Sequence, residues 1–143
     1  MPIYTCLHAP GVISKDQKKA IADEITRIHC GVTGAPRSFV NAYFTEVAHG
    51  SHFRGGKPAD EISVQAVIRA GRSWTDKQRI AREVSEAVAK VTGRDVAEVS
   101  TTVMDLDNRF IFEFGSYMPQ PGTEKDWIAG LQGRAKELVQ EFN

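Results

Sequence analysis

The chain has 143 residues with 18 basic and 18 acidic side chains, so it carries no formal net charge, and 41% of its residues are hydrophobic. This composition is typical of one compact domain that can bury a core without disulfides or a structural metal. A neutral chain lacks the positive field that attracts nucleic acids or anionic membranes, and the sequence has neither a signal-peptide pattern nor a membrane-spanning apolar stretch, so we expect a cytoplasmic protein with no nucleic-acid or membrane partner.

The first half of the chain predicts a strand at 3–8, an amphipathic helix and a second strand at 39–47. The helix pattern begins with a capping box opened by Ser14 and stops at Gly34. A linker at about 48–61 follows, and its glycine-rich and histidine-rich composition suits a mobile loop.

The second half repeats this order, with predicted strands at 62–69 and 99–106 on either side of a helix. A capping box opened by Thr75 and a stop at Gly93 delimit that helix. With an offset of 59 residues, the apolar stripes of the two helices coincide: Ile21, Ile25, Ile28 and Val32 fall on Ile80, Val84, Ala87 and Val91.

Two successive β-α-β units predict an α+β fold. Each crossover should be right-handed and should pair parallel strands. Joining the units about a pseudo-twofold axis gives a four-stranded mixed sheet with both helices on one face. We therefore expect a single domain over 1–143, with an internal repeat at about 2–47 and 62–106 and a C-terminal extension at about 107–143.

The extension is predicted to contain one strand and one helix. In the segment 109–115 three phenylalanines recur at every second position, so they should share one face of a strand, with Glu113 on the other. A last helix should open at Thr123, after a Pro-Gly pair, and carry apolar residues at helical spacing as far as Phe142.

Standard catalytic and cofactor motifs are absent from the sequence. His49 and His52 are three residues apart, but no third metal ligand is near them in sequence. A Gly55-Gly56-Lys57 run lacks the rest of a phosphate-binding loop. We expect no metal and interpret both histidines as solvated loop residues.

Pro2 follows Met1 directly. Proline is common near chain ends, so its position alone indicates no function. If Met1 is removed, however, Pro2 becomes a free secondary amine at the head of a strand. An α-amino group, with an ordinary pKa of about 7.7–8.0, can give or accept a proton near neutral pH.

Arg69 and Arg72 follow the strand that should lie antiparallel to the first one. That arrangement sets Pro2 beside both arginines. Two guanidinium groups next to a proton-transferring amine suit a small anionic carboxylate substrate, because the arginine fork matches a carboxylate. The alternative is that both arginines lie in a solvated turn.

Two further polar residues have an ordinary structural interpretation. His29 lies near the end of the first helix, where it can contact last-turn carbonyls. Glu113 can be a solvent-facing residue of an exposed strand. Neither residue is marked as functional by its position alone.

Several short segments together resemble the tautomerase superfamily, and most closely its cis-3-chloroacrylic acid dehalogenase subgroup. These are the Met-Pro start, the duplicated β-α-β, the I-R-x-G-R run at 68–72, the E-F-G run at 113–115 and the P-G-T-E run at 121–124. Each motif is short, but their order and spacing are fairly specific, and the resemblance spans nearly the whole chain.

The resemblance implies the tautomerase fold and a set of site residues. Pro2 corresponds to the catalytic proline and Glu113 to the glutamate that activates water. His29, Arg69 and Arg72 correspond to the residues that bind the substrate carboxylate. The family further implies a homotrimer with no metal and no organic cofactor.

One position departs from the family pattern. Thr102 stands where the family has an active-site tyrosine, and its hydroxyl is too close to the backbone to replace a phenol. Tyr4, Tyr43 and Tyr117 are elsewhere in the sequence, although folding could bring one of them nearby. Thr102 therefore remains a candidate site residue that puts efficient dehalogenation in doubt.

The resulting expectation is a tautomerase or hydratase of small unsaturated carboxylic acids, with slow hydrolytic dehalogenation of cis-3-chloroacrylate. The alternative is a catalytically silent trimeric scaffold or binding protein of the same fold. Retention of Met1 would favour this alternative, because it turns the nitrogen of Pro2 into an amide.

Overall fold

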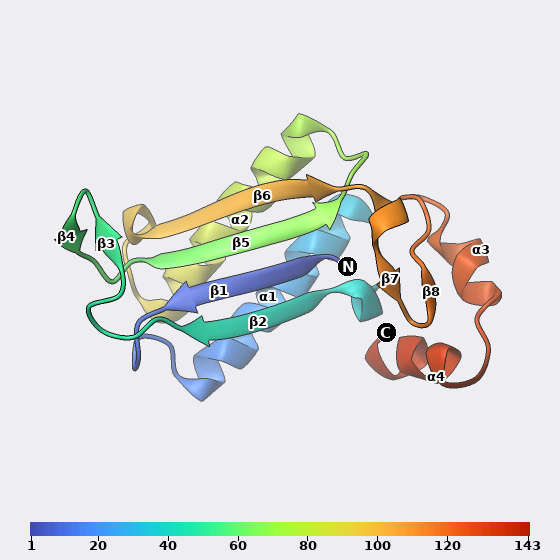
Figure 1. The fold of residues 1–143 in the computed structure, drawn as a ribbon, viewed down its shortest axis with the longest axis horizontal. Coiled ribbons are helices and arrows are strands. Elements are labelled where there is room, and N and C mark those ends of the chain that lie inside the picture. The colour runs from blue at the N-terminus through green and yellow to red at the C-terminus, as the bar shows by residue number, and fades with distance from the viewer.

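The computed structural model describes residues 1–143 and has two β-α-β units followed by a C-terminal extension (Figure 1). The elements are β1 (Ile3–His8), α1 (Lys15–Thr33), β2 (Asn41–Glu46), β3 (Phe53–Arg54), β4 (Lys57–Pro58), β5 (Ile62–Arg69), α2 (Trp74–Thr92), β6 (Val99–Leu106), β7 (Phe112–Glu113), β8 (Ser116–Tyr117), α3 (Glu124–Ala129) and α4 (Gly133–Phe142).

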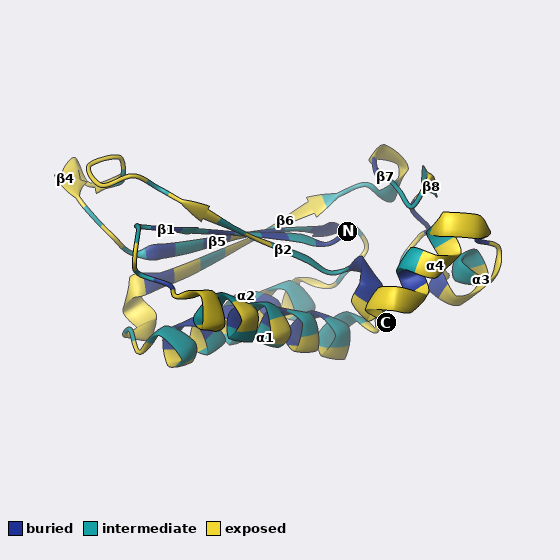
Figure 2. Cartoon of the chain, turned by 90° about the horizontal axis from the view of Figure 1, so that it is seen from below, coloured by how far each residue is buried: buried dark blue, intermediate teal, exposed yellow.

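The main sheet has the strand order β2-β1-β5-β6. Strands β1 and β2 pair in parallel, as do β5 and β6, and the two pairs meet through an antiparallel β1–β5 ladder. Both α1 and α2 cover the same face of this sheet, and the opposite face is open (Figure 2). The predicted four-stranded mixed sheet with two helices on one face is confirmed.

The core lies between the two helices and the sheet. Apolar residues at helical spacing in α1 and α2 face alternate residues of β1 and β5, because successive strand side chains point to opposite faces. The largest fully buried apolar side chains in this core are those of Tyr4, Ile21, Ile25, Ile28, Ile62, Ile68, Ile80, Val64, Val84 and Val88. Their packing fixes the register of β1 against β5, and so fixes which residues meet at the ends of these strands.

Local capping defines three of the four helix ends as predicted. Ser14 and Gln17 form the expected capping box of α1, and Gly34 and Gly93 close both helices with positive φ. The prediction for the start of α2 is wrong: Ser73 is its N-cap and accepts a hydrogen bond from the Asp76 backbone N–H, so Thr75 lies inside the helix. Ser73, two residues before Thr75, can cap the helix in the same way, because its hydroxyl accepts a hydrogen bond from the backbone N–H three residues further on.

The predicted mobile linker contains a short hairpin. Strands β3 and β4 pair through Phe53–Pro58 and Arg54–Lys57. Gly55 and Gly56 connect them, and both have positive φ, as a tight two-residue turn of type I′ requires. This hairpin lies at the end of the sheet away from the N-terminus (Figure 1).

The extension differs from its prediction in two respects. The expected strand at 109–115 is a second hairpin, β7–β8, whose turn residues Phe114 and Gly115 both have positive φ. The three phenylalanines therefore do not share a face, since Phe110 and Phe112 are exposed whereas Phe114 packs inward. The expected single C-terminal helix is broken between α3 and α4 around Gly130, consistent with the low helix propensity of glycine.

No helix of the chain is both long enough and apolar enough to cross a membrane.

Candidate active site

The start of β1 lies beside the end of β5, and the β7–β8 hairpin lies next to it at the same end of the sheet (Figure 1). Ile3 pairs with Val67, and the backbone N–H of Asn41 donates to the carbonyl of Pro2. Pro2 is buried at this junction. The antiparallel register therefore brings the N-terminus next to Arg69, as predicted.

The terminal amine of Met1 forms an ion pair with Glu113. The side-chain amide of Asn41 donates to the other carboxylate oxygen at 3.2 Å, so the carboxylate is held from two sides. Burial lowers the pKa of the amine below its ordinary value of 8.0, and Arg69 lowers it further, although Glu113 acts in the opposite direction. Glu113 is thus a partner of the N-terminus, and its interpretation as a merely solvent-facing residue is wrong.

The side chain of Met1 occupies a second, smaller apolar cluster at this end of the sheet. It is 4% exposed and lies with Phe39, Ile111 and Met118, while Phe114 and Trp127 pack around them. The cluster joins the first unit to the extension. It also forms an apolar wall beside the N-terminal amine.

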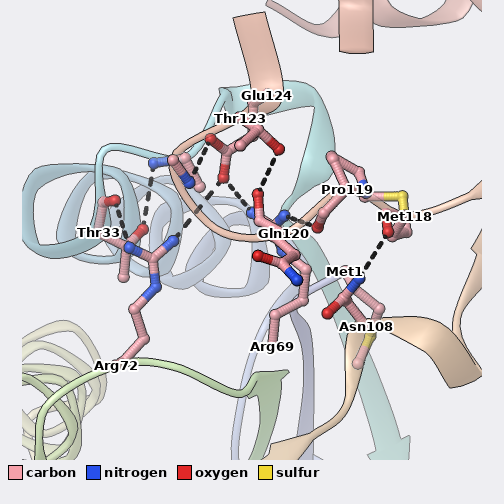
Figure 3. Close-up of polar contacts among 12 residues, drawn as sticks. Met1, Thr33, Arg69, Arg72, Asn108, Met118, Pro119, Gln120, Thr123 and Glu124 are labelled. Carbon is pink, nitrogen blue, oxygen red and sulfur yellow. Dashed lines mark hydrogen bonds and ion pairs between the residues drawn. The ribbon is translucent and has the colours of Figure 1, made fainter. Parts of the chain in front are cut away.

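Arg69 is buried, with a side chain only 3% exposed, so the solvated-turn interpretation is wrong for this residue. Its guanidinium donates to the carbonyl of Pro119 at 2.7 Å and to Glu124 Oε1 at 2.5 Å (Figure 3). The same group lies 5.5 Å from the ring centroid of Phe39, a cation–π geometry. These contacts hold Arg69 in one orientation.

Arg72 lies next to this pair and is 15% exposed at its side chain. Its Nη1 donates to the carbonyl of Thr33 at 2.9 Å, and its Nη2 is 3.9 Å from Glu124 Oε1 (Figure 3). A turn that contains Gly71 with positive φ joins the two arginines and brings both toward one carboxylate. Burial and the neighbouring Arg69 lower the pKa of Arg72.

His29 is buried at the end of α1, and its Nδ1 is 2.8 Å from the hydroxyl of Tyr4. This bond replaces the predicted contact with last-turn carbonyls. Burial lowers the pKa of His29 to about 3, and the charges of Arg72, Arg69 and the N-terminus contribute in the same direction. His29 is therefore neutral at physiological pH and can act as a hydrogen-bond donor or acceptor, but not as a cation.

The lowered pKa of His29 predicts a specific pH dependence of stability. Below about pH 6.5 the unfolded chain gains a proton at His29 that the native protein does not take up until about pH 3. Stability should therefore fall as the pH decreases through this window, by up to about 1.4 kcal/mol per pH unit from this residue. Urea unfolding from pH 7 to pH 4 should show a shallower fall for His29→Gln than for wild type. The exposed His49→Gln serves as the control, and equal slopes for His29→Gln and wild type would contradict the assignment.

Thr102 is not brought to this site within the chain. It pairs with Gln65 in the middle of β6 and is exposed. Its strand, β6, is an edge strand of the sheet, and β5 lies between it and β1. Of the three tyrosines, Tyr4 reaches the site, through its bond to His29.

A separate cavity of about 600 Å³ lies at the opposite end of the sheet, against the linker. Buried His8 and the two linker histidines contribute to its lining. No cluster of three or more histidine, cysteine or acidic side chains in the chain is placed to hold a metal ion. This cavity contains none of the predicted site residues.

Three residues that contact the site were given no role in it by the sequence interpretation. Glu124 follows the P-G-T run, but nothing in the sequence pairs it with an arginine that precedes it by more than 50 residues. Tyr4 alternates with core residues of β1 and so looks like core. Asn41 looks like an ordinary first residue of a strand. Only the tertiary arrangement shows these contacts.

A duplicated β-α-β sheet, with its N-terminus beside the carboxylate of Glu113 and the buried Arg69, defines the chain as a protein of the tautomerase superfamily. The chain belongs to the Tautomerase_3 family, described as "Putative oxalocrotonate tautomerase enzyme", which matches residues 1–130. Among curated proteins, none matches the chain significantly in sequence.

Solved structures agree with this assignment. The crystal structure of N1, a member of the cis-3-chloroacrylic acid dehalogenase family, is similar with a TM-score of 0.93 and 27% identity, covering 98% of this chain and 99% of N1. The crystal structure of native Ps01740 has 35% identity and a TM-score of 0.76, covering 78% of this chain and 100% of Ps01740. A fused 4-OT symmetric trimer shares the fold with 20% identity and a TM-score of 0.76, covering 84% of this chain and 98% of that one.

Proposed function

We propose that the chain, once Met1 is removed, is a cofactor-independent tautomerase in which Pro2 moves a proton on a small unsaturated carboxylic acid. The observation that supports this most directly is the N-terminal amine, which pairs with Glu113 at the end of the sheet where Arg69 is buried. The secondary amine of Pro2 would lie near the same two charged groups: Arg69, which together with burial lowers the pKa of the Met1 amine, and Glu113, which acts in the opposite direction. A fraction of the Pro2 amine is then unprotonated near neutral pH.

In tautomerisation, neutral Pro2 takes the hydroxyl proton of a 2-hydroxy enol acid and returns a proton to C3, giving the 2-keto acid. Arg69 and Arg72 bind the carboxylate and stabilise the negative charge that develops on the enol oxygen. His29, neutral and fixed by Tyr4, adds a hydrogen bond without a charge. No cofactor is needed for this proton transfer.

Hydration and dehalogenation require one more step. Glu113 would activate water for attack at C3 of a 3-haloacrylate, and protonated Pro2 would deliver a proton to C2. The β-halohydrin then loses the halide and a proton to give malonate semialdehyde. Thr102 cannot help to hold the water as a phenol would, so this reaction should be slower than tautomerisation.

Activity on the two substrate types tests the proposal. We expect measurable ketonisation of phenylenolpyruvate and slow turnover of cis-3-chloroacrylate. Thr102→Tyr should raise the turnover of cis-3-chloroacrylate more than that of phenylenolpyruvate, provided that the ring fits. Because Thr102 lies on the exposed side of the sheet, its effect would act on a site completed by a neighbouring copy. Equal wild-type efficiency on both substrates would show that Thr102 is no handicap.

We expect the protein to be a homotrimer. The open face of the sheet and its two edge strands carry exposed apolar side chains, including Tyr43 and Met104, which subunit contacts would cover. The fused 4-OT relatives include a symmetric trimer, which supports the same assembly here. Multi-angle light scattering checks this, and a stable monomer at micromolar concentration would contradict it.

The second candidate is a catalytically silent scaffold or binding protein of the same fold. The observation that favours it is the buried side chain of Met1, which packs well where it stands. A chain that keeps Met1 has no basic nitrogen at Pro2. Intact mass of the native protein discriminates the two: loss of one methionine residue supports the enzyme, and retention supports the scaffold.

A further inference from the structure

The carboxylate of Glu124 already occupies the space between the two arginines (Figure 3). Its Oε1 is 2.5 Å from Arg69 Nη2 and 3.9 Å from Arg72 Nη2. We propose that Glu124 is a positioning residue that reduces the charge of the arginine pair and so makes the site selective for ligands with a single carboxylate. This inference rests on the proposed function, because it takes the two arginines as the residues that bind the substrate.

Glu124 is held in place by its surroundings. The backbone N–H of Gly122 donates to Glu124 Oε2 at 2.8 Å, and Arg69 binds the neighbouring carbonyl of Pro119. The loop also lies close to the arginine turn, since a Cβ at Gly71 would meet Pro121 at 3.8 Å. The ion pair is therefore part of the packing between β5 and the extension and does not depend on a free surface side chain.

The net charge of the arginine site follows from its ionised side chains. Two guanidinium groups and the carboxylate of Glu124 leave one positive charge. In its protonated form, as in the ion pair with Glu113, the N-terminal amine offsets the charge of that carboxylate, and His29 is neutral. Burial raises the pKa of Glu124, but the hydrogen bond from Arg69 and the backbone donors outweigh this and lower it, so the carboxylate is ionised at neutral pH.

One net positive charge neutralises one carboxylate. A second carboxylate on the ligand would enter a site without a matching charge, beside the apolar wall formed by Phe39 and Ile111. Removing the charge of Glu124 leaves both guanidinium groups uncompensated. A dianion should gain about twice as much from this change as a monoanion, because the interaction scales with the product of the charges.

Crotonate and fumarate test this directly, because they share a trans four-carbon skeleton and differ by one carboxylate in place of a methyl group. Dissociation constants are measured by NMR titration of the trimmed protein, whose loss of Met1 is verified by intact mass. In wild type, we expect fumarate to bind no more tightly than crotonate. In Glu124→Gln, the affinity for fumarate should rise about tenfold more than that for crotonate.

Two further variants separate charge from structure. Glu124→Asp keeps the charge and should keep the wild-type preference. Asp126→Asn removes an exposed charge from the same helix and should leave both dissociation constants unchanged. If Glu124→Gln does not fold, the wild-type measurement still decides, because fumarate binding at least tenfold tighter than crotonate would overturn the proposal.

Two other results of the binding measurements would contradict the role of Glu124. Equal changes for both anions in Glu124→Gln, or no saturable binding of either anion to wild type, would also overturn the proposal. Turnover of phenylenolpyruvate in the same samples separates this test from the proposed function. The expected binding pattern without turnover supports the role of Glu124 and removes the tautomerase proposal, whereas turnover with an unchanged selectivity ratio removes only the role of Glu124.

Discussion

Pro2→Ala should lower kcat/KM for phenylenolpyruvate and for cis-3-chloroacrylate by about 10²-fold or more, the usual scale for a lost general acid–base group. The pyrrolidine ring prevents rotation about the N–Cα bond and so fixes the direction of the nitrogen lone pair, which the freely rotating primary amine of alanine does not reproduce. The effect should exceed that of Thr102→Tyr on either substrate. Steady-state kinetics on trimmed protein, verified by intact mass, measure it.

Two controls accompany this measurement. Pro10→Ala changes a proline at the other end of β1, beyond His8, and should leave kcat/KM unchanged. Pro2→Leu has a bulky second residue that should keep Met1 in place, so it should be inactive for a different reason. Normal activity of Pro2→Ala would rule out proton transfer by the N-terminal proline.

Arg69→Ala should lower kcat/KM by about 10²-fold or more, as expected for the loss of one preorganised charged donor. It should also destabilise the protein by about 3–5 kcal/mol, because it leaves the carboxylate of Glu124 buried without its partner. Arg72→Ala should lower kcat/KM similarly but affect stability less, since Arg72 is more exposed. Kinetics together with urea unfolding measure both effects.

A double variant separates binding from folding. Arg69→Met with Glu124→Leu replaces the buried ion pair by apolar side chains, a change that is often neutral for stability or stabilising. It should recover most of the lost stability and none of the lost activity. Arg134→Ala, at an exposed ion pair of α4, is the surface control. Normal turnover by the folded double variant would show that Arg69 has only a structural role.

The paired units were predictable because their signal is periodic and local. The apolar stripes of α1 and α2, the bounds of β1, β5 and β6, and the two closing glycines all follow from side-chain spacing within one element. The hairpin at Phe114 was not predictable in this way, because a bulky residue rarely adopts positive φ and only its packing against Phe39 and Trp127 explains it.

Only the part of the site that depends on the order and direction of the strands was predictable from the sequence. An antiparallel β1–β5 pair brings Pro2 toward Arg69 once the alternation of apolar side chains sets the register, and this alternation can be read from the sequence. The burial of Arg69 was beyond the sequence, since it depends on Glu124 and Pro119 from the extension. Charged residues are usually exposed, so a buried pair between distant segments leaves no local pattern.

Because the side chain of Met1 is buried, removal of this residue should change the stability of the protein. Removing a methionine that is 4% exposed takes a large apolar side chain from its contacts with Phe39, Ile111 and Met118. A truncation of this kind in a packed interior typically weakens folding by about 2–5 kcal/mol. The trimmed protein would thus be the less stable form, and it would have a vacant hollow beside its new terminus. A ligand with an apolar group of that size would restore the lost packing, so substrate shape and protein stability depend on the same few side chains.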